Sequence, residues 1–250
     1  MDADALDAFA GTAHRRRTQG REIVKERPIL FSAPMVRAIL DGRKAQTRRV
    51  MKPQPVVQTG WVGGAYWERR PARGIEPADQ WCIRDALQFC PYGQPGDRLW
   101  VRETWSTDFA RYYPCERVWY AADDDRRHDI EVRDGVRGIF SPESNLHVPF
   151  RWRPSIHMPR ALSRITLEIT DVRVERLQGI SERDAIAEGI CKTGSGFWST
   201  YGQREVDGTF SPRSSFQSLW ESINGLMSWE SNPWVWVIEF ARITDVGSES

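Results

Sequence analysis

The chain has 250 residues, of which 40% are hydrophobic and 12 are tryptophan, so it can bury a sizeable core as one elaborate domain or two small ones. Its 35 basic and 34 acidic residues leave a net charge of +1, which argues against a protein that coats nucleic acid with its whole surface. The sequence has no long apolar run, no secretory signal and no C-x-x-C pair among its four cysteines, so we expect a cytoplasmic protein without a metal or cofactor.

The chain begins with a segment that carries no folding signal. Residues 1–26 are rich in Ala, Asp and Arg and lack strand periodicity, which predicts a flexible tail. A short strand at 29–31 follows, and then a helix that Ser32 can cap, because the next apolar residues share one helical face. Gly42 suits the left-handed conformation that ends a helix, and residues 47–50 predict the next strand.

The middle of the chain alternates between irregular and strand-like segments. Residues 53–92 are rich in Gly, Pro and Trp without a sustained period, which predicts an ordered insertion held by aromatic contacts. A turn at Gly96 leads into a strand at 98–104. Within 165–174 the apolar alternation changes phase by one residue, which predicts a bulge or bend of the kind that curves a barrel.

The last part of the chain predicts two helices and a closing strand. Ser181 and Asp184 form a capping-box-like start to a helix that ends at Gly189, and Ser211 opens a second helix. Residues 234–240 are apolar on both faces, which predicts a central, buried strand. Strands and helices do not alternate regularly, and no nucleotide-binding glycine motif is present, so we predict an α+β fold and not a Rossmann fold.

The segment GRKAQTRR, residues 42–49, contains the densest group of side chains that can bind a ligand or take part in catalysis. It places the amine of Lys44 three residues before the hydroxyl of Thr47, among several guanidinium groups. Such an amine can activate the hydroxyl, or both groups can bind an anion or a polar base. Local composition alone favours a simpler interpretation, which is a basic surface turn.

The segment resembles the Gly-x-Lys-x-x-Thr-x-Arg signature of the ASCH family, a branch of the PUA-like superfamily. Four residues match its fixed positions: Gly42, Lys44, Thr47 and Arg49. Further stretches resemble the larger, phage-type members in the same order, and they are 92–105, 155–160, 181–190 and 234–240. The resemblance covers roughly residues 28–243.

The resemblance implies a PUA-like curved β-barrel flanked by a few helices. It implies one domain over residues 27–245, followed by a short tail at 246–250. Long insertions are expected at about 53–92 and 104–150, because this chain is much larger than a minimal ASCH domain.

Some small ASCH proteins are amidohydrolases that remove the acyl group from N4-acetylcytidine and related N4-acylcytosines. The resemblance implies the same activity here, with Lys44, Thr47 and Glu188 as the catalytic residues. In that chemistry Thr47 attacks the acyl carbonyl, and Lys44 serves as its base if burial or nearby cations lower its pKa. The alternative interpretation is a solvated lysine, an ordinary strand threonine and a solvated helix end.

Five further residues are predicted to bind the substrate, a nucleoside or modified nucleobase. Arg43 and Arg49 offer guanidinium groups, although Arg49 can also pair with a structural acid such as Glu103. Trp100 can stack on a base, but aromatic residues in strands more often belong to the core. His157 can orient the substrate or simply hydrogen-bond a loop.

Two other classes of function remain open on the sequence. A PUA-like module can bind RNA, DNA or a flipped, modified base without chemistry, in which case Lys44 and Arg49 contact phosphate or base. Binding of this kind weakens steeply with salt, whereas hydrolysis of a nucleoside does not. The long insertions also fit a phage or prophage accessory protein that binds another protein.

Overall fold

The computed structural model describes residues 24–57, 65–69, 79–83, 85–108, 118–123, 130–141, 145–201 and 208–244. Nearly all of the predicted N-terminal tail and the whole of the predicted C-terminal tail lie outside the described residues. Parts of the two predicted insertions also lie outside them.

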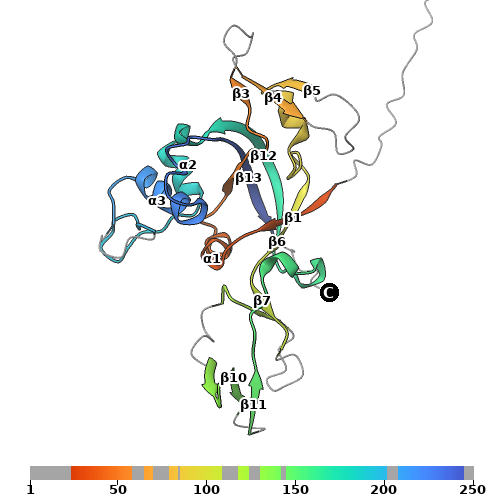
Figure 1. Cartoon of the computed structure of the whole chain (residues 1–250), viewed down its shortest axis with the longest axis vertical. Helices are drawn as coiled ribbons and strands as arrows, with labels where there is room; N and C mark the ends of the chain where they lie inside the picture. The colour runs from red at the N-terminus through yellow and green to blue at the C-terminus, as the bar shows by residue number, and fades with distance from the viewer. Residues whose placement is uncertain are drawn as a thin grey trace, which may run out of the picture.

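A five-stranded sheet forms the centre of the molecule (Figure 1). Its order is β1 (Glu26–Leu30), β6 (Arg98–Arg102), β12 (Thr166–Arg176), β13 (Trp234–Ile243) and β2 (Gln46–Val50). Only β1 and β6 run parallel, and every other neighbouring pair is antiparallel. The register of β12 against β13 shifts between Ile169 and Asp171, which confirms the bulge predicted from the change of phase.

The closing strand lies inside this sheet, as its two apolar faces predict. It is paired with β12 on one side and β2 on the other. Val235, Trp236, Val237 and Ile238 are buried on both faces of the strand. Trp236 and Ile238 pack in the larger core with β6 and β12, while Val235 and Val237 pack in a second core with the helices. The strand therefore joins the two cores.

In the described part of the chain, three α-helices accompany the sheet. They are α1 (Ala33–Leu40), α2 (Glu182–Ala187) and α3 (Pro212–Asn224). The side chain of Ser181 accepts a hydrogen bond from the amide of Asp184, which confirms the predicted start of α2. Helices α2 and α3 lie together at one side of the sheet (Figure 1).

Short strands lie at both ends of the molecule (Figure 1). One end carries a three-stranded sheet of β3 (Val56–Val57), β4 (Ala65–Arg69) and β5 (Asp79–Cys82), followed by the 3-10 helix η1 (Asp85–Phe89). The opposite end carries β7 (Trp105–Ser106) with β8 (Trp119–Tyr120), and a sheet of β9 (Ile130–Arg133), β10 (Val136–Ser141) and β11 (Leu146–Pro149). The described residues also form the 3-10 helices η3 (Ser155–His157), η4 (Arg160–Leu162) and η5 (Leu177–Gly179).

The fold is mixed α+β, mostly strands with few helices, as predicted. Its described sheets do not close into a barrel, because β1 and β2 remain the two edges of the large sheet. One side chain connects these edges: Arg49 Nη2 on β2 donates to the carbonyl of Leu30 on β1 at 2.6 Å. The edges thus approach each other without a backbone ladder. Within the described residues, no helix is long and apolar enough to cross a membrane.

Candidate functional site

The motif begins where α1 ends. Gly42 has a φ of +72°, in the left-handed region that the sequence predicts for it. The amides of Arg43 and Lys44 both donate to the carbonyl of Ala38, at 2.8 and 2.9 Å. These bonds close the helix and send the chain directly into β2, so Lys44 leaves the helix at a fixed position.

Lys44 and Glu188 form a buried ion pair, although 144 residues separate them in the chain. Lys44 Nζ lies 2.9 Å from Glu188 Oε2 and 2.7 Å from the Glu188 carbonyl oxygen. The side chains expose 0% and 4% of their surface. The amide of Ala45 also donates to the carbonyl of Ala187 at 2.9 Å, so backbone bonds hold the end of α2 against the motif.

Arg48 is a second cation on the same carboxylate, and the sequence analysis did not place it in the site. Its Nη1 lies 3.1 Å from Glu188 Oε1, while its Nη2 lies 3.0 Å from Glu175 and 3.4 Å from Asp184. The Arg48 side chain is fully buried. Its three carboxylate partners come from β12 and from the region of α2, so spacing along the chain gives no sign of them.

A pocket lies beside this ion-pair network and encloses about 80 Å³. Polar residues of the motif and of α2 form one wall: Thr47, Arg48, Arg49 and Glu188. The other walls are largely apolar and come from α1, β2 and α3, with Met35, Val50, Phe216, Leu219, Trp220, Ile223 and Asn224. Lys44 does not line the pocket itself, and it reaches the wall through Glu188. The pocket therefore combines a hydroxyl, a carboxylate and two guanidinium groups.

Burial governs the electrostatics of Lys44 and Arg49. Burial lowers the pKa of Lys44, and the charges of Arg49 and Arg48 lower it further, while Glu188 opposes the shift. Burial likewise lowers the pKa of Arg49. Lys44 therefore gives up its proton more readily than a solvated lysine, as a general base must.

Of the predicted site residues, Thr47, Arg49 and Glu188 line the pocket and Lys44 lies directly behind Glu188. Arg43 does not line this pocket. It is exposed, pairs with Asp41 at 2.8 Å and lines a different cavity with Cys191 and Trp198.

Three predicted binding residues lie outside the pocket. Trp100 is a core residue of β6, 8% exposed, with the guanidinium of Arg102 4.8 Å from its ring centre. Glu103 forms two hydrogen bonds of 3.0 Å with Arg164, so it does not pair with Arg49, and burial raises its pKa. His157 is exposed in η3.

The site contains no cluster of metal ligands among the described residues, and it has no match among known proteins. No three His, Cys, Asp or Glu side chains converge as metal ligands in the described part of the chain. Comparisons with protein-family models, curated proteins and solved structures found no match.

Proposed function

We propose that this chain is an amidohydrolase that removes the acyl group from N4-acylcytosine-type nucleosides such as N4-acetylcytidine. One observation carries the proposal: a buried Lys44–Glu188 pair, 2.9 Å apart, backs a pocket that Thr47 lines. A lysine, a threonine and a glutamate are the residue types that the resemblance to ASCH amidohydrolases assigns to catalysis. The lowered pKa of Lys44 supports a basic role for it.

In this mechanism the neutral amine of Lys44 takes the proton of the Thr47 hydroxyl as its oxygen attacks the acyl carbonyl. Arg49, which alternation places on the same face of β2 as Thr47, stabilises the oxygen that becomes negative. The carbon–nitrogen bond then breaks, and the cytosine amine leaves with the proton that Lys44 received. Water hydrolyses the acyl-threonine ester and regenerates the hydroxyl, with Lys44 again moving the proton. Glu188 holds the lysine amine throughout.

We propose a PUA-like arrangement for the large sheet. The mixed strand order, the bulge in β12 and the contact between the two edge strands at Arg49 and Leu30 support it. In this proposal the motif sits at the point where the curved sheet nearly meets itself, which is where a ligand pocket can form between its edges and α3.

Hydrolysis of N4-acetylcytidine, followed by ultraviolet absorbance, tests the proposed activity. We expect turnover by the unaltered protein and its loss in Thr47→Ala. Thr170→Ala is the matched control, because Thr170 is an exposed threonine of β12 away from the pocket. Equal turnover in Thr47→Ala and Thr170→Ala rejects Thr47 as the nucleophile, and no turnover by folded, unaltered protein rejects the activity.

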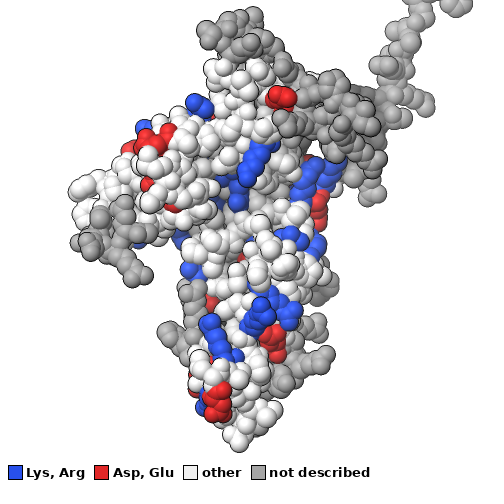
Figure 2. All heavy atoms as spheres, viewed as in Figure 1, with Lys and Arg blue, Asp and Glu red and all other residues white. Residues whose placement is uncertain are grey.

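A second candidate function is binding of a modified base without chemistry. One observation favours this function. Among the described residues, Lys44 Nζ donates hydrogen bonds to Glu188, and no hydrogen bond joins Lys44 Nζ to Thr47. On the face shown in Figure 2, basic side chains form separate groups with acidic ones between them, which fits a single base better than a long strand. Binding of cytidine without turnover is the result that selects this candidate.

A further inference from the structure

Arg49 is a partly buried cation that makes no direct ion pair among the described residues, and the carboxylate of Glu188 acts on it only at longer range. Its Nη2 donates to the carbonyl of Leu30 at 2.6 Å, and its guanidinium lies 5.2 Å from the ring centre of Phe31. No ion pair joins it to a carboxylate within the described residues. The nearby Tyr92 does not supply a charge either, because burial raises the pKa of its phenol and keeps it neutral. Burying a charge without a partner is costly, so this position is suited to a charge that arrives with a ligand.

Unused hydrogen-bond donors gather in the same pocket. Among the described arginines, only Arg48 and Arg49 have a buried Nε without an acceptor, and both line the pocket. The indole Nε1 of Trp220, in the opposite wall, is also buried without an acceptor. Buried donors are nearly always satisfied in folded proteins. Three buried donors without an acceptor line this one pocket, so a ligand group that accepts hydrogen bonds would satisfy them there.

The carboxylates of the protein do not fill this role. Glu188 has one oxygen on Lys44 and the other on Arg48. Glu175 and Asp184 contact Arg48 through its Nη2, and neither accepts a hydrogen bond from its Nε. Arg48 thus has carboxylates in direct contact, whereas Arg49 has none among the described residues. Arg49 therefore lines the pocket together with the two other residues that have a free donor, Arg48 and Trp220.

We propose that the pocket binds a small anionic oxygen group of the ligand, a carboxylate or a phosphate, which pairs with Arg49 and accepts from the donors that the protein leaves free. This inference rests on the proposed function, because it concerns the ligand of the same pocket, and it narrows the substrate to one that carries a negative charge. A guanidinium suits either group, because its fork of donors matches two oxygens at once.

Two matched ligand pairs distinguish the sources of the anion. N4-succinylcytidine differs from N4-butyrylcytidine by a carboxylate in place of a methyl group on the acyl chain. Cytidine 5′-monophosphate differs from cytidine by the phosphate. Calorimetric titration of the full chain at low ionic strength, with Thr47→Val for the acylated pair to prevent turnover, gives all four affinities. We expect the anionic member of one pair to bind about tenfold more tightly, or more, than its neutral partner.

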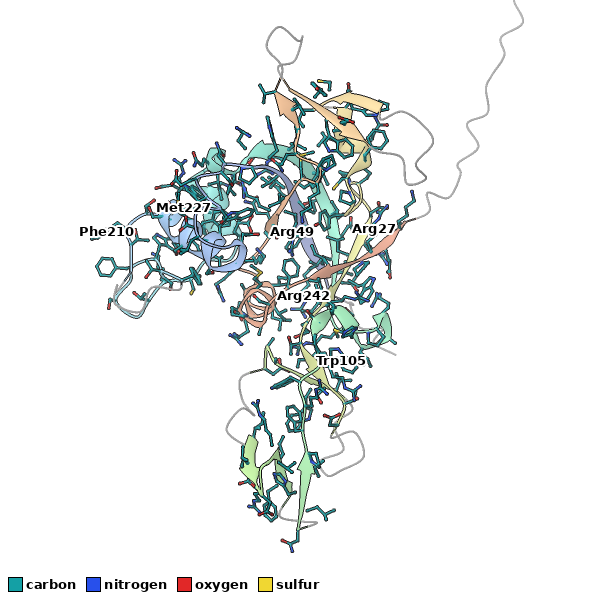
Figure 3. The ribbon with its side chains drawn as sticks, in the orientation of Figure 1. Arg27, Arg49, Trp105, Phe210, Met227 and Arg242 are labelled. Carbon is teal, nitrogen blue, oxygen red and sulfur yellow. The ribbon has the colours of Figure 1, made fainter. Side chains whose placement is uncertain are left out.

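Variants of Arg49 test whether this preference comes from the pocket. Arg49→Met is expected to abolish it, and Arg49→Lys to keep part of it, because lysine retains the charge but not the fork of donors. Arg242→Met is the matched control, since Arg242 is an exposed arginine of β13 outside the pocket; Figure 3 labels both residues. The affinities of the four ligands are measured on protein that keeps Arg49. The anion preference can therefore be tested even if Arg49→Met does not fold.

The outcomes separate this inference from the proposed activity. Equal affinity within both pairs, no binding of any of the four ligands, or a preference unchanged in Arg49→Met each overturns the anion site. An anion preference that Arg49→Met removes, together with no hydrolysis of any amide, supports the anion site and rejects the amidohydrolase. Hydrolysis without an anion preference supports the amidohydrolase and rejects the anion site.

Discussion

At the scale of single residues, the site depends on one carboxylate shared by two buried cations. Glu188 accepts from Lys44 with one oxygen and from Arg48 with the other. Arg48 in turn contacts Glu175 and Asp184, which anchor it from the far side. Such a network gains little stability over apolar packing, but breaking it is costly because it leaves unpaired charges behind. Its value is the fixed position that it gives to Lys44 and Glu188 beside Thr47.

Arg48→Met is expected to destabilise the fold strongly. The change removes a common partner of three carboxylates, and loss of one member of a buried pair costs about 3–5 kcal/mol of unfolding free energy. Urea denaturation of the variant and the unaltered protein measures the difference. Arg176→Met is the control, because Arg176 is an exposed residue of β12, and it is expected to change stability by about 0.5 kcal/mol or less. Equal losses in the two variants would contradict the network.

The pH dependence of hydrolysis is expected to report the pKa of Lys44. Only the neutral amine can take a proton from Thr47, so kcat/KM rises with pH as Lys44 deprotonates. Because the pKa of Lys44 is lowered, this rise is centred below 10.5, the ordinary lysine value. A pH–rate profile with correction for uncatalysed hydrolysis measures it. A rise centred at 10.5 or above, or one that persists in Lys44→Met, argues against Lys44 as the base.

At the scale of elements, the site requires the end of α2 to dock against the start of β2. Gly189 follows Glu188 and has a φ of +87°, and a Cβ there would lie 2.8 Å from the Cβ of Lys44 and 2.9 Å from that of Ala38. A side chain at this position would separate the two segments. Glycine thus permits both the left-handed turn and the close approach that pairs Lys44 with Glu188.

Gly189→Ala is therefore expected to cost more stability than Gly196→Ala. Gly196 has the same φ of +87°, but a Cβ there meets nothing within 4 Å, so it reports the conformational cost alone. The extra loss at Gly189 is expected to be about 1–3 kcal/mol, as for other overpacked positions. Thermal or urea unfolding of both variants gives the difference. If the two variants unfold alike, the close approach does not matter to the fold.

The sequence predicts elements well where the signal is local. The helix before Gly42, the bulge in β12 and the cap at Ser181 follow from periodicity and capping, which act within a few residues. The ion pairs of Arg48 with three carboxylates and the contribution of α3 to the pocket do not follow from the sequence. Strand alternation says that Arg48 and Thr47 point to opposite faces, but not which carboxylates will meet Arg48 more than 120 residues later. Glu103 and Trp100 lie outside the pocket. Their partners are set by tertiary packing, which local sequence patterns do not reveal.

At the scale of the whole molecule, the pocket and the β9–β11 sheet belong to different hydrophobic cores. The pocket lies between the large sheet and the helices, whereas the distal sheet has its own small core of Trp119, Ile139, Val148 and Phe150. Figure 1 shows this sheet at the far end of the molecule from β3–β5. Separate cores predict that the distal part can be weakened without disturbing the site.

Ile139→Ala is expected to weaken the distal core and leave catalysis intact. Truncation of a buried isoleucine costs about 2–5 kcal/mol, here confined to the small core. Hydrogen exchange of β10 and β11 should become faster, while kcat and KM for N4-acetylcytidine remain unchanged. A change in kcat or KM similar to that of a pocket variant would show that the distal sheet is coupled to the site.

The central claim is that Lys44 and Thr47 act as one catalytic unit, and a double-mutant cycle on N4-acetylcytidine hydrolysis tests it most directly. The measured quantity is kcat for the unaltered protein, Lys44→Ala, Thr47→Ala and the double variant. Residues that act as a unit give non-additive losses, so we predict that the double variant is no slower than either single variant. Losses that multiply in the double variant, or a single variant with unchanged kcat, would contradict the account.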